Sequence, residues 1–538
     1  MKKIFEYLRR QSDEHESVLR VQQHELWFCF TKFQIIIEFL DLEDDDFNDN
    51  FVLITDIDFS VLFSKEISRI YIQASTPIYE DREDMFFETS YTNYVNYLIN
   101  AIKKQYPEAI SDYEVMQFCI DDCGSDYGCP EAWEYGFQIN IDEDYWTSDF
   151  FYNFLLNEIE ANLPDFFIPP FYNTQTELKE SFEVKILNTN TKIRRLGYMK
   201  VLLRMINEQS KVPISKINFK FEKYCTEYDL FLQIYKNKKG NVIVTKTGNS
   251  ANPYIEMAVS LGLIHKSAGV YEVGKTGKVY NILKDKIDVP DTNPFVLSKF
   301  DTTFFLELLL KEDYWFLYAI LEQTAINPII AYKSLKKEFK SILLTQIAQF
   351  IDKAQDNNEQ RVLPLKMIER RINDWKKPEV YMEHVLMPRL NWLYDMELID
   401  LKNDLSFHLT KEGERLLFNL TVWNDIALHR IVSPISYIDN YFMKMTTFAL
   451  DLKKNMRIYQ TEKVIECLNE SFVLFKTLAP NRVTFSLFAN YTKHILFWNN
   501  FEAIDTADLK NLFESKQLPN YIYKYQEQYK DGYIQKQN

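Results

Sequence analysis

The chain has 538 residues, of which 46% are hydrophobic and 15% aromatic, but it has only 12 glycines and 17 prolines. This composition excludes a disordered or low-complexity protein and predicts several domains with hydrophobic cores. No run of 18 uncharged apolar residues occurs, and the charged start MKKIFEYLRR argues against a secretory signal. We therefore expect a cytoplasmic protein that has no membrane partner and keeps its six cysteines reduced.

The net charge of −16 is distributed unevenly along the chain. Residues 1–180 contain 12 basic and 37 acidic residues, whereas residues 181–290 contain 19 basic and 9 acidic residues. The first segment therefore has a net charge of −25 and the second a net charge of +10. This asymmetry predicts either a basic surface that the acidic domain covers until nucleic acid displaces it, or an acidic domain that binds a basic partner protein. Solvated faces of opposite sign would give the same counts.

Short runs of β-branched and aromatic residues dominate the beginning of the chain and indicate strands at 26–30, 33–40, 50–54 and 69–74. The elements expected next are a helix at 91–102, strands at 115–120 and 135–141, and a helix at 149–161. Residues 1–170 are therefore predicted to form one acidic α+β domain. The stretch 163–190, which contains several prolines, asparagines and threonines, is expected to separate this domain from the rest.

The most informative local pattern lies at 245–283. A helix is expected to begin near Asn252 and Pro253 and to end at Gly262, since these residue types favour helix starts and helix ends. A β-hairpin is expected at 263–273, and a further helix from Thr276.

Residues 385–420 repeat this order of elements. Aligning Leu263 with Leu398 places equivalent residues together, namely Tyr271 with Phe407, Lys275 with Lys411, and Gly277 with Gly413. In this second copy Glu397 stands where the first copy has the helix-ending glycine, so we expect its helix to end with a different bend.

The helix, the β-hairpin and the Lys-x-Gly turn into another helix resemble the winged-helix modules of bacterial regulators, restriction enzymes and phage-defence proteins. The predicted fold class is multi-domain: an N-terminal α+β domain, a mainly α region with two winged-helix-like modules, and a helical C-terminal region. The expected domains are the acidic domain at 1–170, a basic winged-helix-like domain at 181–290, a helical domain at 300–425 that ends in the second module, and a helical domain at 430–538. Amphipathic helices at 304–325 and 329–354 lie between the two modules.

The resemblance implies how such a module would contact duplex DNA. One helix enters the major groove, the hairpin lies over the backbone, and lysines neutralise phosphates. The residues of the first copy that match these roles are Lys246, Asn249, Asn252, Tyr254, Lys266, Lys275 and Lys278. In the more acidic second copy, we expect Arg389 and Lys411 to be paired on the surface. The implied protein is a bacterial phage-defence or mobile-element subunit that binds or senses nucleic acid, with a scaffold for a protein effector subunit as the alternative.

A metal-dependent nuclease is a further alternative. Pro164 and Asp165, followed by Glu183, Val184 and Lys185, match the PD-(D/E)xK pattern, in which two carboxylates hold a metal and a lysine steadies the attacking water. That fold requires the carboxylates on adjacent strands, whereas two prolines and a helix-like ELKE lie between them.

Other catalytic patterns are weak or absent. Three cysteines of residues 119–129 have no fourth zinc ligand nearby, at positions Cys119, Cys123 and Cys129. No phosphate-binding loop, dinucleotide motif, nucleophile elbow or HExxH motif occurs. Apart from the nuclease alternative, we therefore expect neither a metal nor a cofactor, and we favour a protein that is not an enzyme.

Overall fold

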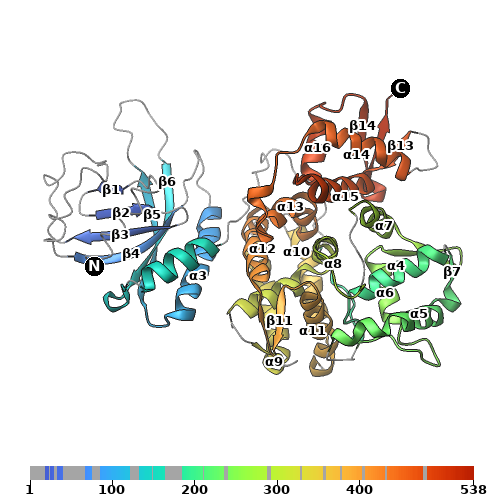
Figure 1. Ribbon diagram of the computed structural model, residues 1–538, viewed down its shortest axis with the longest axis horizontal. Helices are drawn as coiled ribbons and strands as arrows, with labels where there is room; N and C mark the ends of the chain where they lie inside the picture. The colour runs from blue at the N-terminus through green and yellow to red at the C-terminus, as the bar shows by residue number, and fades with distance from the viewer. Residues whose placement is uncertain are drawn as a thin grey trace. The chain divides into compact units, whose positions relative to one another are not determined.

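The computed structural model divides the chain into two compact units, 1–165 and 166–538 (Figure 1). The structure describes residues 19–22, 25–29, 33–39, 67–75, 85–120, 132–147, 149–163, 184–209, 211–235, 240–287, 293–326, 330–355, 359–375, 378–402, 406–430, 433–475 and 481–537. The division between the units falls within the stretch 163–190 that the sequence marks as a boundary. Each unit has buried hydrophobic residues of its own.

The N-terminal unit contains an antiparallel sheet with the strand order β1-β2-β3-β4-β6-β5. Its strands are β1 (Leu19–Gln22), β2 (Glu25–Cys29), β3 (Gln34–Phe39), β4 (Ile67–Ser75), β5 (Ile110–Ile120) and β6 (Ala132–Ile141). Successive side chains at Ile35, Ile36 and Ile37 are all buried, so both faces of the sheet are covered at β3.

Helical segments pack on this sheet. The long helix α3 (Met85–Gln105) contacts β5 and β6. A short turn η3 (Glu143–Tyr145) and a π-helical segment η4 (Asp149–Glu160) follow the last strand. Phe150 and Phe154 of η4 each pack edge-on against Tyr106, with ring centroids 5.0 Å apart. The α+β fold predicted for this region is confirmed, while the strand expected at 50–54 lies outside the described residues.

One order of elements occurs three times in the described part of the C-terminal unit: a helix, a short strand, a second helix, a further helix and a β-hairpin. Repeat 1 (197–273) contains α4 (Gly197–Gln209), β7 (Val212–Pro213), α5 (Ile217–Cys225), α6 (Asn252–Ser260), β8 (Ile264–Ser267) and β9 (Val270–Val273). Repeat 2 (299–409) contains α8 (Lys299–Ile326), β10 (Ile330–Ala331), α9 (Tyr332–Gln355), α11 (Pro378–Asp395), β11 (Ile399–Lys402) and β12 (Ser406–Leu409). Repeat 3 (461–536) contains α14 (Thr461–Leu474), β13 (Arg482–Thr484), α15 (Phe485–Ile495), α16 (Thr506–Glu514), β14 (Tyr521–Gln526) and β15 (Asp531–Lys536).

The three small sheets have the same topology. In each repeat the last strand lies between the other two and pairs antiparallel with both, in the orders β7-β9-β8, β10-β12-β11 and β13-β15-β14. The short first strand therefore ties the beginning of each repeat to its closing hairpin.

Other helices and turns join or extend the repeats. The longer ones are α7 (Lys275–Ile287), α10 (Glu359–Asn373), α12 (Lys411–Arg430) and α13 (Pro434–Ala449). The shorter ones are η5 (Ile214–Lys216), η6 (Thr226–Ile234), η7 (Lys453–Asn455), η8 (Leu496–Asn500) and η9 (Glu527–Tyr529). Of the helices that the structure describes, none combines the length and the apolar character needed to cross a membrane.

The core of the C-terminal unit surrounds α8, which is buried along most of its length and contacts α9, α11, α12 and α13 (Figure 1). Its helical geometry is interrupted at Asp313, where φ is −153° and ψ is 29°. The buried apolar residues form one continuous cluster from Leu187 to Ile534. The regions expected as separate domains after residue 181 therefore share one core.

The structure corrects the prediction of an entirely helical C-terminal region. Residues 521–536 form the β14–β15 hairpin, which pairs with β13. The ring of Tyr523 packs on Phe485 and Phe513, with centroids 4.6 and 6.0 Å apart. Strands form here because tyrosines recur at every second position in YIYKYQ, a period-2 pattern. When only hydrophobicity is considered, Lys524 and Gln526 make this segment resemble a solvated tail.

The third long helix of each repeat ends in the same way. In α6, α11 and α16 the second residue after the helix has a positive φ, of 67° at Gly262, 60° at Glu397 and 57° at Lys516. The amide of the following residue then donates a hydrogen bond to the carbonyl five residues earlier, as Leu263 does to Ala258 and Leu398 to Leu393. The expectation that Glu397 changes the bend is therefore wrong, because Glu397 adopts the left-handed conformation that Gly262 adopts.

The alignment of Gly277 with Gly413 has a steric reason. A Cβ atom at Gly277 would lie 2.1 Å from the carbonyl oxygen of Leu263, and one at Gly413 would lie 2.0 Å from that of Leu398. Each glycine lets the helix after the hairpin approach the backbone at the hairpin's start. The two copies found in the sequence are therefore equivalent at this contact.

Replacing Glu397 with glycine is expected to stabilise the protein. A side chain in the left-handed region costs about 1–2 kcal/mol, and the entropy cost of glycine is about 0.5–1 kcal/mol. The substitution should therefore raise the free energy of unfolding by about 0.5–1 kcal/mol. Urea denaturation would measure this change. Gly262→Ala at the matching position serves as the control and should destabilise, since its Cβ would lie 2.9 Å from Thr276 Oγ1. A destabilised Glu397→Gly variant would contradict the prediction.

Candidate nucleic-acid interface

A buried carboxylate fixes the loop that leads into α6. Glu222 of α5 accepts hydrogen bonds from the backbone amides of Thr245 (2.7 Å) and Ser250 (2.9 Å), and from the Thr245 hydroxyl (2.9 Å). The hydroxyl of Tyr198 in α4 accepts a hydrogen bond from the Val242 amide at 2.9 Å. The loop 240–251 is therefore held in place although it forms neither helix nor strand.

Tyr254 belongs to this buried framework rather than to a binding surface. Its side chain is 0% exposed. Its hydroxyl accepts a hydrogen bond from the Arg194 amide (3.0 Å) and donates one to the Gly240 carbonyl (2.7 Å). Burial raises the pKa of the Tyr254 hydroxyl, which therefore stays protonated. The prediction that Tyr254 contacts nucleic acid is corrected, because Tyr254, the third residue of the amphipathic helix α6, points into the protein.

Three of the predicted contact residues lie together at the start of α6. Lys246 and Asn249 are exposed in the loop, and Asn252 is the first residue of the helix. Lys192 Nζ donates a hydrogen bond to the Asn249 carbonyl at 3.3 Å. Asn218 of α5 donates one to Asn252 Oδ1 at 3.4 Å, so α5 and α6 adjoin at this end.

The predicted contact lysines that follow α6 in the sequence do not all lie near the start of that helix. Lys266 is exposed on β8, with its Nζ 5.9 Å from the ring centroid of Tyr271. Lys275 and Lys278 are exposed on α7, a helix that packs against α15 of repeat 3. Lys278 Nζ lies 5.7 Å from the ring centroid of Phe475, at the end of α14. Lys278 therefore faces repeat 3 rather than α6.

The sequence interpretation missed a row of lysines along α5. Lys216, Lys220 and Lys223 follow the i, i+4, i+7 spacing of one helix face, beside Phe219, which is 50% exposed. The start of α5 adjoins the hairpin, because the Ile214 amide donates a hydrogen bond to the Gly269 carbonyl at 3.1 Å. The spacing of lysines in KINFKFEK is the signal that could have identified this face.

Helix α11, the counterpart of α6 in repeat 2, is covered by another segment of the same chain. Residues 184–196, which we name the strap, have no regular secondary structure and lie against α11. The hydrogen bonds run from Thr189 Oγ1 to the His384 carbonyl (2.7 Å), from Trp392 Nε1 to the Ile193 carbonyl (2.8 Å), and from the Leu196 amide to Asp395 Oδ2 (2.9 Å). Repeat 2 therefore uses its third long helix for internal packing.

Arg389 of α11 is buried, not paired on the surface as expected. Only 1% of its side chain is exposed. Its guanidinium donates hydrogen bonds to Asp313 Oδ2 (2.5 Å) and Oδ1 (2.8 Å), and to the carbonyls of Leu187 (3.1 Å) and Val385 (2.7 Å). The Leu187 amide in turn donates to Asp313 Oδ1 at 3.0 Å. Arg389 thus joins the strap, α11 and the irregular turn of α8. Lys411, by contrast, is exposed.

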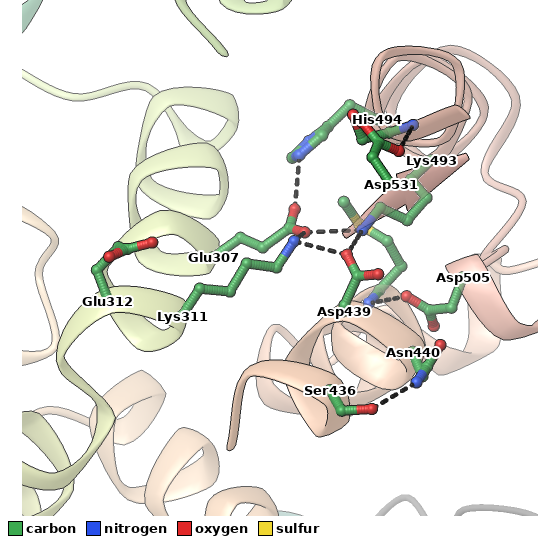
Figure 2. Close-up of polar contacts among 12 residues, drawn as sticks. Glu307, Lys311, Glu312, Ser436, Asp439, Asn440, Lys493, His494, Asp505 and Asp531 are labelled. Atoms are coloured by element: carbon green, nitrogen blue, oxygen red, sulfur yellow. Dashed lines mark hydrogen bonds and ion pairs between the residues drawn. The ribbon is translucent and has the colours of Figure 1, made fainter. Parts of the chain in front are cut away.

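A second group of buried charges joins α8 to α13 and α15 (Figure 2). Glu307 Oε1 lies 2.7 Å from both Lys311 Nζ and Lys493 Nζ, and Glu307 Oε2 lies 3.0 Å from His494 Nε2. Asp439 Oδ1 lies 2.8 Å from Lys311 Nζ. Burial alone would raise the pKa of Glu307, but the charges of Lys311 and Lys493 hold it well below its ordinary value. Each charge here faces an opposite charge, so the group serves packing rather than ligand binding.

The nuclease and zinc patterns gain no support from the described residues. Asp165 and Glu183 lie outside the described residues, and Lys185 Nζ forms an ion pair with Glu312 at 2.8 Å. Cys123 and Cys129 also lie outside them. Within the part of the chain that the structure describes, no group of three His, Cys, Asp or Glu side chains is arranged to hold a metal ion.

Comparisons with models of protein families, with curated proteins and with solved structures found no match to this chain. The functional interpretation therefore rests on the arrangement of the residues described above.

Proposed function

We propose that repeat 1 is a winged-helix module that binds duplex nucleic acid, with DNA as the expected ligand. The observation that carries this proposal is the set of lysines on three neighbouring elements around α6: Lys216 and Lys223 before and on α5, Lys246 in the loop, and Lys266 on the hairpin are exposed, and Lys220 on α5 is half-buried. Helix, strand, helix, helix and hairpin is the order of a winged helix, in which the third helix and the hairpin approach the duplex. Repeats 2 and 3 would be winged helices by the same criterion.

Two further observations support a polyanionic ligand. Residues 181–290 have a net charge of +10 within a chain of −16, and a basic surface attracts nucleic acid over several ångströms. Lys216, Lys223 and Lys246 have no ion-pair partner in the part of the chain that the structure describes. Their ammonium groups are therefore available to phosphates.

The proposal includes the setting that the resemblance implies: a bacterial, cytoplasmic subunit of a phage-defence or mobile-element system. DNA binding and a cytoplasmic location are consistent with each other, and the setting rests on the resemblance alone.

Replacing Lys216, Lys223 and Lys246 together with alanine is expected to weaken duplex binding on the order of 100-fold at about 0.1 M salt. Loss of three phosphate contacts should also make the slope of log K against log salt shallower by about 3. Fluorescence anisotropy with a labelled duplex would measure both quantities. A variant that loses the same charge elsewhere, Lys333, Lys337 and Lys454 to alanine, is the matched control, because these residues are exposed on α9 and η7. Equal losses in the two variants would count against a defined interface.

The second candidate function is a scaffold that holds a protein effector subunit. The use of α11 for internal packing favours it, since one repeat already uses its third long helix for protein contact. Under this alternative, the full chain should fail to bind duplex even at low salt, and the lysine-to-alanine variants should give the same result as the unmodified chain.

A further inference from the structure

The solvent-facing side of α6 lacks lysine and arginine, the residues that most often read base edges. The helix spans NPYIEMAVS and contains neither lysine nor arginine. Its side chains that face outward are Asn252, Glu256, Val259 and Ser260, which recur at helical spacing, and Val259 is 39% exposed. The one charged group on this face is therefore a carboxylate.

The polar groups on this face are already engaged. Asn252 Nδ2 donates a hydrogen bond to Glu256 Oε1 at 2.8 Å, while Asn252 Oδ1 accepts one from Asn218. Ser260 Oγ donates a hydrogen bond to the Glu256 carbonyl at 3.1 Å. A bidentate contact to adenine needs both ends of an asparagine amide, and here both ends have partners.

The positive charges flank α6 instead of lying on it. Lys216 directly precedes α5 and Lys220 and Lys223 lie on it, while Lys246 lies in the loop before α6 and Lys266 on the hairpin after it. The hydrogen bond from Asn218 to Asn252 joins α5 to α6, and the one from Ile214 to Gly269 joins the start of α5 to the hairpin tip. Cations on the elements next to a helix that itself carries none are placed for phosphates rather than for base edges.

We infer that repeat 1 holds the sugar-phosphate backbone of a duplex without reading its sequence, and that Glu256 limits affinity by repelling the phosphates equally on every sequence. The inference rests on the proposed function and narrows its ligand to duplex nucleic acid of any sequence. Phosphate contacts fix register and supply affinity, while base-edge contacts supply specificity. The first kind has its residues around α6, whereas the polar side chains on the outward side of α6 already have partners within the described residues.

The test compares the full chain with its Glu256→Gln variant on three labelled duplexes of equal length, one with only A·T pairs, one rich in G·C pairs and one mixed. The unmodified chain should bind all three with Kd values within about threefold of one another. Glu256→Gln keeps an acceptor for Asn252 and should tighten binding to all three by the same factor, about threefold to tenfold at low salt. Glu338→Gln, at an exposed position on α9, removes the same charge and should leave Kd unchanged.

Two results would overturn the inference, and they are distinguishable. A preference of more than about tenfold for cytosine-containing duplexes that Glu256→Gln abolishes would mean that Glu256 accepts a hydrogen bond from cytosine, since carboxylates read the cytosine amino group. In that case the proposed function would stand and only the lack of sequence reading would be wrong. Absence of binding to all three duplexes at low salt would remove the proposed function together with the inference.

Discussion

Replacing Arg389 with alanine is expected to lower the free energy of unfolding by about 3–5 kcal/mol. The substitution would leave the carboxylate of Asp313 buried without its cation, and the carbonyl of Leu187 without a donor that now lies 3.1 Å away. An unpaired buried charge costs far more than the attraction of an exposed ion pair contributes. The effect should therefore be among the largest of any single substitution in the chain.

Urea denaturation, followed by tryptophan fluorescence, would measure the effect of Arg389→Ala. Lys185→Ala is a matched control in the same strap, because Lys185 forms a half-exposed ion pair with Glu312; its cost should stay within about 1 kcal/mol. Replacing both partners by apolar residues, as in Arg389→Met with Asp313→Leu, should cost less than Arg389→Ala alone. If Arg389→Ala unfolded at the same urea concentration as Lys185→Ala, the buried pair would not be holding the strap.

Replacing Glu307 with alanine is expected to destabilise the protein by a similar amount, about 3–5 kcal/mol near neutral pH. Among the described residues, the ammonium groups of Lys311 and Lys493 would then have only Asp439 as an ion-pair partner, with its Oδ1 2.8 and 3.6 Å from them. His494 would also lose the carboxylate that its Nε2 contacts (Figure 2). Glu307→Gln, which keeps the shape but not the charge, should lie between the alanine variant and the unmodified chain.

The effect of Glu307→Ala should depend on pH in a defined direction. Because the pKa of Glu307 is held well below its ordinary value in the folded protein, its charge contributes stability at every pH above the unfolded pKa of about 4.3. That contribution is lost as the pH falls through the lower pKa of the folded state. Urea curves for both proteins between about pH 3 and pH 7 should therefore converge on the acidic side. A constant difference across that range would mean that the charge of Glu307 is not what stabilises the contact.

Local patterns in the sequence predicted the elements that depend on nearby residues. The helix ending at Gly262, the hairpin after it and the equivalence of Gly277 and Gly413 all follow from spacing within about 30 residues, and the structure confirms each of them. Repeat 3 was missed because it has Lys516 at the position of Gly262 and a hairpin with little hydrophobic contrast. A left-handed residue that is not glycine leaves no mark in the sequence.

The candidate site could be predicted only in part, because exposure depends on contacts between distant segments. Composition located the basic region, and Lys246, Asn249 and Lys266 are exposed there. Tyr254 is of a residue type that can contact nucleic acid, but it is buried beneath the loop at Gly240. Arginine usually lies on the surface, yet Arg389 is buried with partners that come from 76 and 202 residues away along the chain. No local pattern contains those partners.

The strap imposes an order of events on the synthesis of this protein. Leu187 precedes Arg389 by 202 residues, and Ile193 precedes Trp392 by 199 residues. At about 5–20 residues per second, a ribosome needs about 10–40 s to cover that distance. Throughout that interval the nascent strap has none of its α11 partners, so the strap becomes ordered only after most of repeat 2 has been translated.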